Sequence, residues 1–427
     1  MRGRPPLPEG PYLVVGLARS GAAVARVLAD HGEVIGCDAG RPDPPEGIEV
    51  HLESDGLDLL ERVEAVVKSP GVPREAPVVR AALERGIPVD GELELAWRLL
   101  PNRFLAVTGT NGKTTTVELL GAIHRAAGAP VAVAGNVGTP LAALVGEIGP
   151  AAAVVCEVST FQLEDASEFT PECAVLLNIA EDHLDRHGSF EAYREAKLSI
   201  FSRQAADDVA VAPLDLDVPR RTVSFGGPGA DLSHEGDALL WRGERLISTG
   251  EIRLRGAHNL ENAMAASAAA MATGVAPAGV TRALRGFDGL PHRLEEVATV
   301  GDVLYVDDSK ATNVAAAVRG IEAFDAGVHA ILGGSLKGGG FAGLRTAVSA
   351  RCRACYLIGA AADRLEADLE GTVPLRRSGD LESAVREASV SAQPGDVVLL
   401  SPACAAFDAY RDYAHRGEHF QELVSKA

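Results

Sequence analysis

The chain has 427 residues and a formal net charge of −19; 47% of its residues are hydrophobic and 23% are charged. This composition is typical of a folded globular protein of several domains, so general disorder is excluded. The acidic balance argues against a nucleic-acid binder, which needs a basic face. No apolar run approaches the roughly 20 residues that span a bilayer, and the Pro- and Arg-rich start is unlike a signal peptide. We expect a cytoplasmic protein without membrane insertion.

Cysteine and lysine usage give two further indications. The six cysteines are scattered, and Cys352 and Cys355 form a lone CxxC pair, so we expect thiols and no zinc site. Only six of the 40 basic residues are lysines, at positions 68, 113, 197, 310, 337 and 426. A chain that avoids lysine is expected to keep it where a compact ammonium is chemically needed.

The first part of the chain alternates strands and helices, with strands predicted over 12–16, 33–37, 65–68 and 87–89. Gly16-x-Ala18-x-x-Gly21 follows the first strand and Asp38 ends the second, which makes a degenerate dinucleotide fingerprint. Arg19 and Arg41 near the same edge favour a diphosphate ligand. Ordinary strand–helix turns remain the alternative.

Two further alternations follow, with boundaries predicted near residues 92 and 290. The second has strands predicted over 104–108, 131–134, 152–158, 173–179 and 209–212, then hairpins over 214–255 and an Ala-rich helix over 258–273. The third has strands predicted over 303–307, 328–332, 354–358 and 396–400. Such alternation predicts parallel sheets in an α/β chain of three domains, residues 1–92, 93–289 and 290–427.

The strongest local signal is the phosphate loop, Gly109–Thr115, with the sequence GTNGKTT between a predicted strand and helix. Its backbone N–H groups and the helix N-terminus would hold phosphate oxygens. Lys113 would reach the outer phosphates and Thr114 would offer its hydroxyl to Mg²⁺. The spacing is a shortened form of the usual G-x-x-x-x-G-K-[ST] pattern, because position 107 is Val.

Two carboxyl ends of neighbouring predicted strands carry candidate metal ligands. Glu157 ends the strand over 152–158, where a nucleotide-binding α/β protein holds its metal-binding carboxylate. Asn178 and then His183, among acidic residues, follow the next strand. A structural His183 and a solvated Glu157 are the alternatives.

Lys197 lies on the apolar face of a helix predicted over 189–201, together with Tyr193 and Phe201. Its ammonium could snorkel to water. Alternatively, burial could lower its pKa until the amine takes up CO₂ and becomes a carbamate, a carboxylate-like ligand for a hard cation. The sequence leaves both readings open.

Three more blocks place amides or lysines at helix starts and sheet edges. His258-Asn259-x-x-Asn262 puts two amides on one helix face, suited to a base or ribose. Asp308–Asn313 and Gly333–Gly340 each follow a predicted strand and carry Lys310 and Lys337, which suits anionic groups. Plain turns and caps are the alternative for each block.

The order of these motifs resembles the ATP-dependent Mur ligases. The shared segments are GTNGKTT, EVSTFQLE, LNIAEDHLDRH, GAHNLEN, GLPHRLE, DDSKATN, LGGSLKGGG and LSPACAAFD. VVKSPGVP, STFQLE, GLPHR and SPACA look most like the members that add D-glutamate to UDP-N-acetylmuramoyl-L-alanine, a peptidoglycan precursor. The resemblance implies a Rossmann-like N-terminal domain, a central P-loop ATPase-type domain and a Rossmann-like C-terminal domain. It also implies a cytoplasmic enzyme, which we expect to be a monomer.

The resemblance implies a role for each matching position. Residues expected to hold the acceptor substrate are Arg19, Ser20, Asp38, Arg41, Ser69, Gly71, Asn136, Ser159 and Gln162. Residues expected to bind ATP are Gly109, Thr110, Asn111, Gly112, Lys113, Thr114, Thr115, Asn259, Asn262, Arg293, Asp308 and Lys310, with His292 beside them. Residues expected to hold D-glutamate are Lys337, Ala406, Phe407 and Tyr413. Thr114, Glu157, His183 and a carbamylated Lys197 would hold two Mg²⁺, and Lys113, Glu157, His183 and Lys197 form the expected catalytic set.

The chemistry that the resemblance implies is amide-bond formation through an acyl phosphate, with domain closure to keep water away. One position departs from the family pattern. The serine that ends SPACAS, and contacts the D-glutamate carboxylate, is Ala406 in this chain. Alternatives are a related ligase for another amino acid or for folate, and a nucleotide-binding regulator without ligase activity. A dehydrogenase is disfavoured by the phosphate loop and by Ala18.

Overall fold

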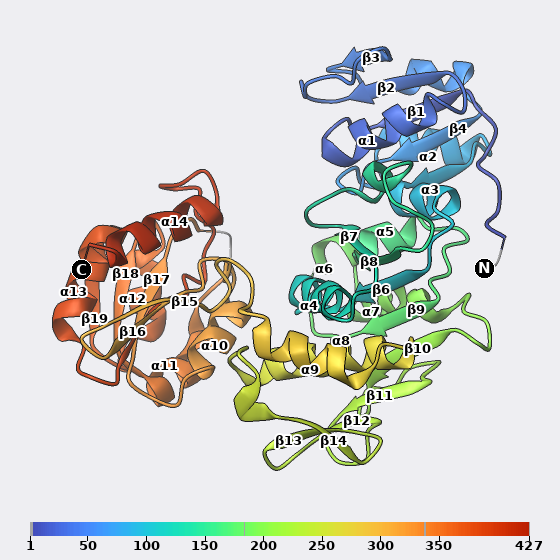
Figure 1. Ribbon diagram of the computed structural model, residues 1–427. Helices are drawn as coiled ribbons and strands as arrows, with labels where there is room; N and C mark the ends of the chain where they lie inside the picture. Colours follow the sequence, from blue (N-terminus) through green and yellow to red (C-terminus); the bar gives the residue numbers. More distant parts are fainter. Residues whose placement is uncertain (1–2, 183, 337–338, 427) are drawn as a thin grey trace. The chain divides into compact units, whose positions relative to one another are not determined.

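The computed structural model describes residues 3–182, 184–336 and 339–426. Within them the chain forms three β-sheets and divides into two compact units (Figure 1). Unit 1 comprises Met1–Glu251 and Glu261–Arg285, and unit 2 comprises Ile252–Leu260 and Gly286–Ala427. The first two sheets belong to unit 1 and the third to unit 2, which confirms the predicted α/β fold.

The N-terminal sheet is parallel, with strand order β3-β2-β1-β4-β5. Its strands are β1 (Tyr12–Val15), β2 (Val34–Asp38), β3 (Glu49–Leu52), β4 (Ala65–Lys68) and β5 (Val89–Gly91). Its helices are α1 (Arg19–Leu28), the 3₁₀ turn η1 (Leu57–Arg62), α2 (Pro77–Glu84) and α3 (Glu92–Leu99). The sequence did not predict β3, because this edge strand reads EVHL and lacks the buried apolar run of β1.

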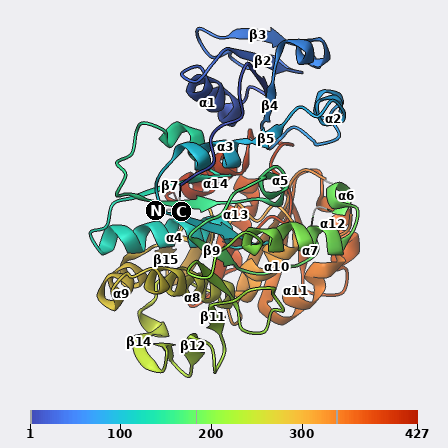
Figure 2. The same cartoon turned by 90° about the vertical axis from the view of Figure 1, so that its right-hand side faces the viewer.

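Buried charged groups fix the N-terminal sheet onto the central part of unit 1. Lys68, at the end of β4, forms an ion pair with Asp165, and both side chains are buried. Glu94 on α3 accepts hydrogen bonds from the backbone N–H groups of Glu168 (3.0 Å) and Phe169 (2.8 Å). Separating the partners of such a buried pair would leave an uncompensated buried charge. These contacts therefore join the N-terminal sheet firmly to the central part of unit 1. Figures 1 and 2 both show the N-terminal sheet, in blue, at one end of unit 1.

The central sheet has the order β14-β13-β12-β11-β10-β9-β6-β8-β7. Its strands are β6 (Phe104–Thr108), β7 (Val131–Gly135), β8 (Ala153–Glu157), β9 (Cys173–Leu176), β10 (Val209–Pro213), β11 (Val223–Gly226), β12 (Leu232–Glu235), β13 (Ala238–Trp241) and β14 (Glu244–Ser248). The strands from β7 to β12 pair in parallel, and β12–β14 form antiparallel hairpins. The predicted hairpins are therefore confirmed for β12–β14, whereas β11 joins the parallel part.

The helices of the central region connect these strands. They are α4 (Lys113–Ala126), α5 (Thr160–Glu164), α6 (Leu184–His187), α7 (Phe190–Leu198), α8 (Ala257–Ala272) and α9 (Pro277–Gly286), with 3₁₀ turns η2 (Leu141–Leu144), η3 (Ser199–Phe201) and η4 (Thr249–Glu251). The alanines in the middle of α8 are fully buried, because their small side chains allow close packing. The beginning of α8 belongs to unit 2 and the remainder to unit 1.

The C-terminal sheet has the order β15-β16-β20-β17-β18-β19. Its elements are β15 (Glu295–Val300), β16 (Val303–Asp307), α10 (Val314–Glu322), β17 (Val328–Gly333), η5 (Ala342–Leu344), α11 (Arg345–Arg351), β18 (Cys352–Ile358), α12 (Ala362–Leu369), β19 (Leu375–Gly379), α13 (Leu381–Ser391), β20 (Val397–Leu400) and α14 (Tyr413–Val424). The strands β15 and β19 lie at the two edges, and the sequence did not predict them because they are partly exposed and rich in charged residues. β15 is antiparallel to β16, while the other pairs are parallel.

The six cysteines are free thiols, and Cys355 of the CxxC pair is buried. The hydrogen bond with Cys352 and, second, burial raise the pKa of Cys355 well above its usual range. Among the described residues, the single group of His, Cys and acidic side chains close enough to hold a metal does not include these cysteines.

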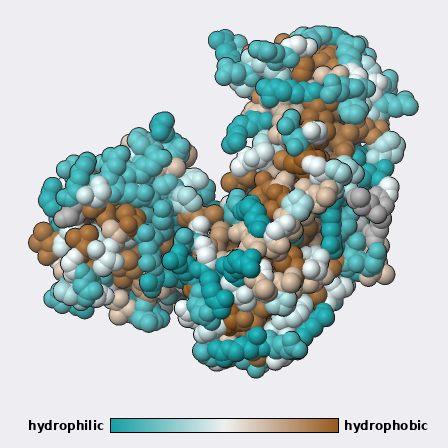
Figure 3. All heavy atoms as spheres, in the orientation of Figure 1, coloured by the Kyte–Doolittle hydropathy of each residue, from teal (hydrophilic) through white to brown (hydrophobic). Residues whose placement is uncertain are grey.

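Apolar side chains are unevenly distributed over the face of the protein that Figure 3 shows. In Figure 3, brown side chains run along the visible face of unit 1, whereas hydrophilic side chains cover most of the visible face of unit 2. Phe407 has the second-largest exposed fraction, 70%, among the large hydrophobic side chains of the described chain. Across the described ranges, no helix has the length and apolar character needed to cross a membrane.

Candidate active site

The phosphate loop joins the end of β6 to the start of α4. Gly112 has a φ of 85°, and a Cβ at this position would overlap the side-chain oxygen of Asn262 on α8. Only glycine meets both demands, so the loop backbone lies directly against Asn262. Thr115 and Thr116, in the first turn of α4, are buried. The loop thus presents its backbone at the carboxyl edge of the sheet, where ligands of α/β proteins bind.

Asn178, which follows β9, fixes the shape of the phosphate loop. Its carbonyl accepts from the N–H of Thr110 (3.0 Å), and its side chain accepts from the N–H of Asn111 (3.0 Å) and donates to the carbonyl of Asn111 (3.1 Å). The sequence placed Asn178 after a strand but gave it no role. Asparagine is rare in this chain, and this rarity is the sequence feature that could have pointed to a role for Asn178.

The ammonium of Lys113 folds back over the loop. Its Nζ donates to the carbonyls of Gly109 (2.9 Å) and Thr110 (3.0 Å). A cation at the N-terminus of α4 is opposed by the helix dipole, so its presence there fits a role in binding an anion.

Glu157, at the end of β8, is a buried carboxylate held by neutral donors. The Thr114 hydroxyl donates to its Oε2 (2.8 Å), and the Asn136 side chain donates to its Oε1 (3.0 Å). Glu157 is 3% exposed and forms no ion pair among the described residues. A buried carboxylate beside a hydroxyl is the donor set that a hard divalent cation prefers, so the residues present fit Mg²⁺.

Lys197 is buried and not snorkelling. Its side chain is 2% exposed, and its Nζ lies 4.4 Å from the centre of the Tyr193 ring. The Tyr193 hydroxyl lies within hydrogen-bond distance of the Thr110 hydroxyl (3.0 Å), which brings Lys197 to the phosphate loop. Burial, and secondly the charge of Lys113, lower the pKa of Lys197 to about 7, with Asp182 opposing the shift. Of the two readings of Lys197, the structure therefore supports the buried amine.

The acceptor-binding residues predicted in the N-terminal sheet gather at the carboxyl edges of β1, β2 and β4, but several already have partners. The Ser69 hydroxyl donates to the carbonyl of Gly16 (2.7 Å). Both oxygens of Asp38 accept backbone N–H groups, from Leu17 and Gly40 (2.7 Å each). Exposed Arg41 pairs with Glu53.

Arg19 and Ser20 begin α1 at the same edge, and Gly71 follows β4 in an exposed turn. Arg19 donates to the carbonyl of Gly138 (2.9 Å) in the central region. It also lines a cavity of about 450 Å³ together with Arg26 and Pro140. This cavity lies at the edge of the N-terminal sheet, and two arginines, Arg19 and Arg26, line it.

Ser159 and Gln162 form a capping box at the start of α5. The Ser159 hydroxyl accepts from the N–H of Gln162 (3.3 Å), and the Gln162 side chain accepts from the N–H of Ser159 (3.0 Å). Their oxygens therefore shape the helix start. The Nε2 of Gln162 is buried and has no hydrogen-bond partner among the described residues.

The two amides of α8 lie in different surroundings. Asn262 lies against Gly112 of the phosphate loop, whereas the side chain of Asn259 donates to the carbonyl of Arg255 (2.8 Å) in unit 2. A cavity of about 530 Å³ lies beside the loop, lined by Asn178, Leu214, Phe225 and Glu261 among others. It has the size and the apolar walls that suit a flat ring.

Unit 2 presents a second cluster at the carboxyl edge of its sheet. Asp308 accepts from the hydroxyl of Ser401 (2.7 Å), and burial raises its pKa to about 7. Lys310 lies 3.7 Å from the centre of the Tyr413 ring, and its N–H donates to the carbonyl of His292. Arg293 follows His292 in the chain, and its side chain is half-buried.

His292 belongs to a hydrogen-bonded network and not to an open metal site. Its Nδ1 donates to Asp307 (2.7 Å), and its N–H donates to Glu295 (2.8 Å). Gln421 on α14 donates to both carboxylates at 3.0 Å. His292, Glu295 and Asp307 lie close enough together to hold a metal ion, but hydrogen bonds already join them to one another.

Arg416 is the functional candidate that sequence reasoning missed. Its side chain is 1% exposed and binds three segments at the sheet edge. It donates to the hydroxyl (3.0 Å) and carbonyl (2.9 Å) of Ser309, to the carbonyls of Cys404 (3.1 Å) and Ala405 (3.3 Å), and to that of Gly333 (3.5 Å). Burial lowers its pKa to about 10. Arg416 lies on the apolar face of α14 with Phe420 and Val424. A charged residue on an apolar helix face is the sequence feature that could have pointed to it.

The residues predicted to hold D-glutamate are partly described. Ala406 is buried, Phe407 is exposed, and Tyr413 begins α14. The N–H of Ser335 donates to the carbonyl of Ala405 (2.9 Å), which ties the Gly333–Ser335 segment to this loop. Lys337 of unit 2 and His183 of unit 1 lie outside the described residues.

Comparisons with known proteins identify similar chains and domains. Residues 107–270 match the Mur ligase middle domain, and residues 292–404 match the Mur ligase glutamate ligase domain. The chain is 42% identical to the UDP-N-acetylmuramoylalanine–D-glutamate ligase of Acidobacterium capsulatum, with 96% of this chain and 95% of that protein covered. It is 41% identical to the enzyme of the same name from Pelotomaculum thermopropionicum, with 96% of each covered.

Solved structures share the fold at lower identity. The UDP-N-acetylmuramate–alanine ligase MurC of Thermotoga maritima aligns with a TM-score of 0.63 at 20% identity, over 98% of this chain and 100% of that one. The MurF ligase of the same organism, solved with ADP, aligns with a TM-score of 0.61 at 20% identity, over 99% and 96%.

Proposed function

Because the chain belongs to the Mur ligase family, we propose that it joins D-glutamate to UDP-N-acetylmuramoyl-L-alanine with ATP, in peptidoglycan precursor synthesis. The observation that carries this function is the near-complete alignment with D-glutamate ligases at about 40% identity. The phosphate loop, Lys113 and the Thr114–Glu157 pair supply the chemistry that such a reaction requires.

ATP would bind with its phosphates on the loop backbone. Asn178 holds that backbone in shape by accepting from the N–H groups of Thr110 and Asn111, so the N–H groups of the following first turn of α4 are in place before the nucleotide arrives. The base would enter the cavity beside Asn178 and Phe225, with Asn262 near the ribose. By family resemblance, Asn259, Arg293, Asp308 and Lys310 would contribute from unit 2, with His292 held by its network.

Thr114, Glu157, His183 and a carbamylated Lys197 would hold two Mg²⁺. When bound, the metal ions neutralise charge that develops on the transferring phosphoryl group. Buried Lys197 would supply its carboxylate ligand by reaction with CO₂: the amine nitrogen forms a bond to carbon and releases a proton. The pKa of about 7 keeps enough of the amine neutral for this reaction at physiological pH.

The reaction would proceed in two transfers. An oxygen of the acceptor carboxylate attacks the γ-phosphorus, the bond to the β-phosphate oxygen breaks, and ADP leaves. The amine of D-glutamate then attacks the acyl carbon, loses a proton, and expels phosphate to form the amide. Lys113 would move from the loop carbonyls to the phosphoryl oxygens and stabilise their charge.

Residues from opposite ends of the sequence would hold the two organic substrates. The uridine diphosphate part would lie at the N-terminal sheet edge, with Arg19, Ser20, Ser69 and Gly71. Arg41 would have to leave its exposed pair with Glu53, and Asp38 would act by shaping the loop. Asn136, Ser159 and Gln162 would complete the acceptor site.

D-Glutamate would be held at the edge of the C-terminal sheet by Lys337, by the backbone at Ala406 and Phe407, and by Tyr413. We also propose three functional domains, residues 1–92, 93–289 and 290–427, each with one of the three sheets. The enzyme would act as a monomer in the cytoplasm, where ATP is available.

The test is ADP formation by the full chain, measured with each substrate omitted in turn. ADP should form only when ATP, D-glutamate and UDP-N-acetylmuramoyl-L-alanine are all present. Lys113→Ala should reduce turnover by about 10²–10³, as for loss of one preorganised electrostatic donor. ADP formation that depends on another amino acid, or on none, would contradict the proposed specificity.

A further inference from the structure

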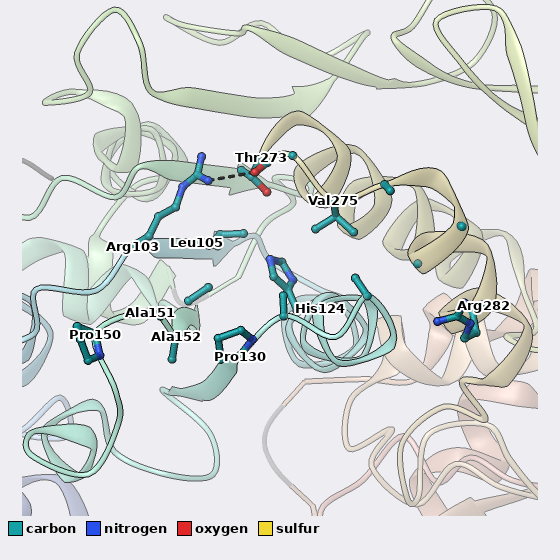
Figure 4. A pocket seen from close by; sticks show the side chains of 17 residues that line it. Arg103, Leu105, His124, Pro130, Pro150, Ala151, Ala152, Thr273, Val275 and Arg282 are labelled. Atoms are coloured by element: carbon teal, nitrogen blue, oxygen red, sulfur yellow. Dashed lines mark hydrogen bonds between the residues drawn. The ribbon is translucent and has the colours of Figure 1, made fainter.

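A third cavity lies at the edge of the central sheet opposite the phosphate loop (Figure 4). It has a volume of about 600 Å³ and is lined by residues that precede β6, β7 and β8 and by residues that follow α8. Arg103 directly precedes β6, whose other end leads into the phosphate loop. This volume falls within the range of small-molecule sites. No step of the proposed ligase reaction uses this cavity.

The cavity is basic in an acidic protein. Arg103, His124 and Arg282 line it, and none of its 17 described lining residues is acidic. Arg103 donates one hydrogen bond to the carbonyl of Thr273 (3.0 Å), and Arg282 donates one to the carbonyl of Ala126 (2.6 Å). A guanidinium has five N–H donors, so each arginine keeps donors for a ligand. In a chain of net charge −19, this concentration of positive charge favours an anion.

His124 supplies an acceptor at the bottom of the cavity. It is 6% exposed, and its Nδ1 donates to the carbonyl of Leu120 (2.8 Å), one turn back on α4. Because Nδ1 carries the proton that it donates to Leu120, the neutral ring presents Nε2 as an acceptor. Burial lowers the pKa of His124, the hydrogen bond to Leu120 opposes this shift, and the charge of Arg103 adds to it. Figure 4 shows the ring directed into the space between Leu105, Thr273 and Val275. A ligand that fills this space needs a hydroxyl or N–H group to satisfy Nε2.

Three elements connect the cavity to the phosphate loop. β6 runs from Arg103 to the loop, and α4 runs from Lys113 to the turn that contains His124 and Ala126. α8 carries Asn262, which lies against Gly112, and ends beside Thr273, which Arg103 binds. The 14 residues of α4 span about 20 Å. A ligand that displaces Arg103 or Arg282 from its carbonyl therefore acts on the far ends of the elements that shape the loop.

We propose that this cavity binds a small hydroxylated anion, a carboxylate or phosphate with at least one hydroxyl, and that its occupation changes the affinity of the phosphate loop for ATP. The arginines would hold the anionic group, and His124 would accept from the hydroxyl. The binding does not depend on the proposed ligase specificity. The effect on ATP rests on nucleotide binding at the loop.

The experiment titrates the full chain by calorimetry with glycerol 3-phosphate and with glycerate, in saturating Mg²⁺ and ADP so that the loop is filled. Both anions should bind saturably, and neutral glycerol should not. The double substitution Arg103→Gln, Arg282→Gln should weaken binding at least tenfold. Arg125→Gln is the control for a nearby change from arginine to glutamine: it removes one positive charge from α4, beside His124, at an exposed position that does not line the cavity. It should bind as the wild type does.

Saturating glycerol 3-phosphate should also shift the KM for ATP of the wild type at least threefold, and should leave that of the double variant unchanged. Several results would overturn the proposal. They are no binding of either anion, equal loss in Arg125→Gln, loss of binding in Lys113→Ala with the double variant unaffected, and an unchanged KM for ATP at saturation. The third would place the anion in the phosphate loop. If the double variant melted at a lower temperature but bound the anions as the wild type does, the two arginines would only cap the ends of α8 and α4.

Discussion

At the scale of single residues, Lys197 is the most unusual group in the described chain. It is a buried lysine beside the phosphate loop, without an ion pair in the described ranges, and near a second ammonium on Lys113. Such a charge is costly to bury, so a purely structural role gives no reason to keep it. A carbamate would remove the positive charge and supply a metal ligand.

We predict that Lys197→Ala is nearly inactive and that acetate or another short carboxylate restores part of its activity. The added carboxylate would replace the oxygen ligands that the carbamate supplies. Turnover is measured by phosphate release with increasing acetate. Lys426→Ala, at an exposed position, is the control and should keep full activity without responding to acetate. Substantial activity of Lys197→Ala without any carboxylate would remove Lys197 from the metal site.

The pH dependence follows from the lowered pKa of Lys197. The amine is neutral above about pH 7 and charged below it, and only the neutral amine takes up CO₂. Wild-type turnover at fixed CO₂ should therefore fall as the pH drops from 7 to 6, while the acetate-rescued variant should not share this decline. In the uncarbamylated protein, the unfolded chain holds a proton that the folded chain lacks between about pH 7 and the usual lysine pKa, so this residue makes stability rise with pH there.

Ala406 tests how the amino acid is held. Ala406→Ser adds a donor where the family pattern has one, so we predict a lower KM for D-glutamate. Hydrogen bonds to charged groups contribute about 1.5–3 kcal/mol, which limits the gain to roughly tenfold to a hundredfold. The KM for ATP should stay the same. Ala409→Ser, which adds the same hydroxyl at an exposed position, is the control. Equal effects of the two substitutions would contradict a D-glutamate site at Ala406.

At the scale of elements, Arg416 on α14 joins the segments that follow β16, β17 and β20. A lysine has three donors on one atom and cannot reach all the oxygens that the planar guanidinium binds. We predict that Arg416→Lys raises the KM for D-glutamate at least tenfold, more than it lowers kcat. A merely structural role would lower the melting temperature and the amount of active enzyme without this selective rise in KM.

Arg220→Lys is the matched control for Arg416→Lys. Arg220 also binds loop carbonyls, those of Ala205, Ala206 and Asp208, but in the central region. We expect it to lose stability with an unchanged KM for D-glutamate. If both variants lose stability alike and keep the wild-type KM, Arg416 does not position the amino-acid site.

The sequence predicted elements where the signal is local. Buried parallel strands such as β1 and β6 are continuous apolar runs, and the phosphate loop needs only its own seven residues to be seen. The edge strands β3, β15 and β19 escaped prediction because their pairing depends on neighbours and not on an apolar pattern.

The sequence predicted the candidate site residues that lie in local motifs, and it did not predict the contacts between distant segments. Arg416 binds Ser309 across 107 positions of the chain, and Asn178 binds Asn111 across 67, so no local spacing reveals either contact. The capping role of Ser159 and Gln162 is local and has a known sequence signature. The family resemblance instead implies that the same two residues hold the acceptor substrate.

At the scale of the whole molecule, the residues that we propose for ATP binding come from both compact units. The phosphate loop and Asn262 belong to unit 1, and Asn259, Arg293, Asp308 and Lys310 belong to unit 2. We propose that these residues together activate a carboxylate by phosphorylation and pass its acyl group to an amine. The fate of the carboxylate oxygen tests this claim without reference to any single residue.

The decisive measurement uses UDP-N-acetylmuramoyl-L-alanine with ¹⁸O in its alanyl carboxylate, together with ATP and D-glutamate, and follows the phosphate and the product by mass spectrometry. The acyl-phosphate route predicts a single ¹⁸O in the released phosphate and the other ¹⁸O in the new amide carbonyl. Unlabelled phosphate would show that no oxygen of the acceptor reaches the γ-phosphorus and would contradict the acyl-phosphate route. ADP formation with the doubly labelled acceptor recovered without an amide would show that water cleaves ATP.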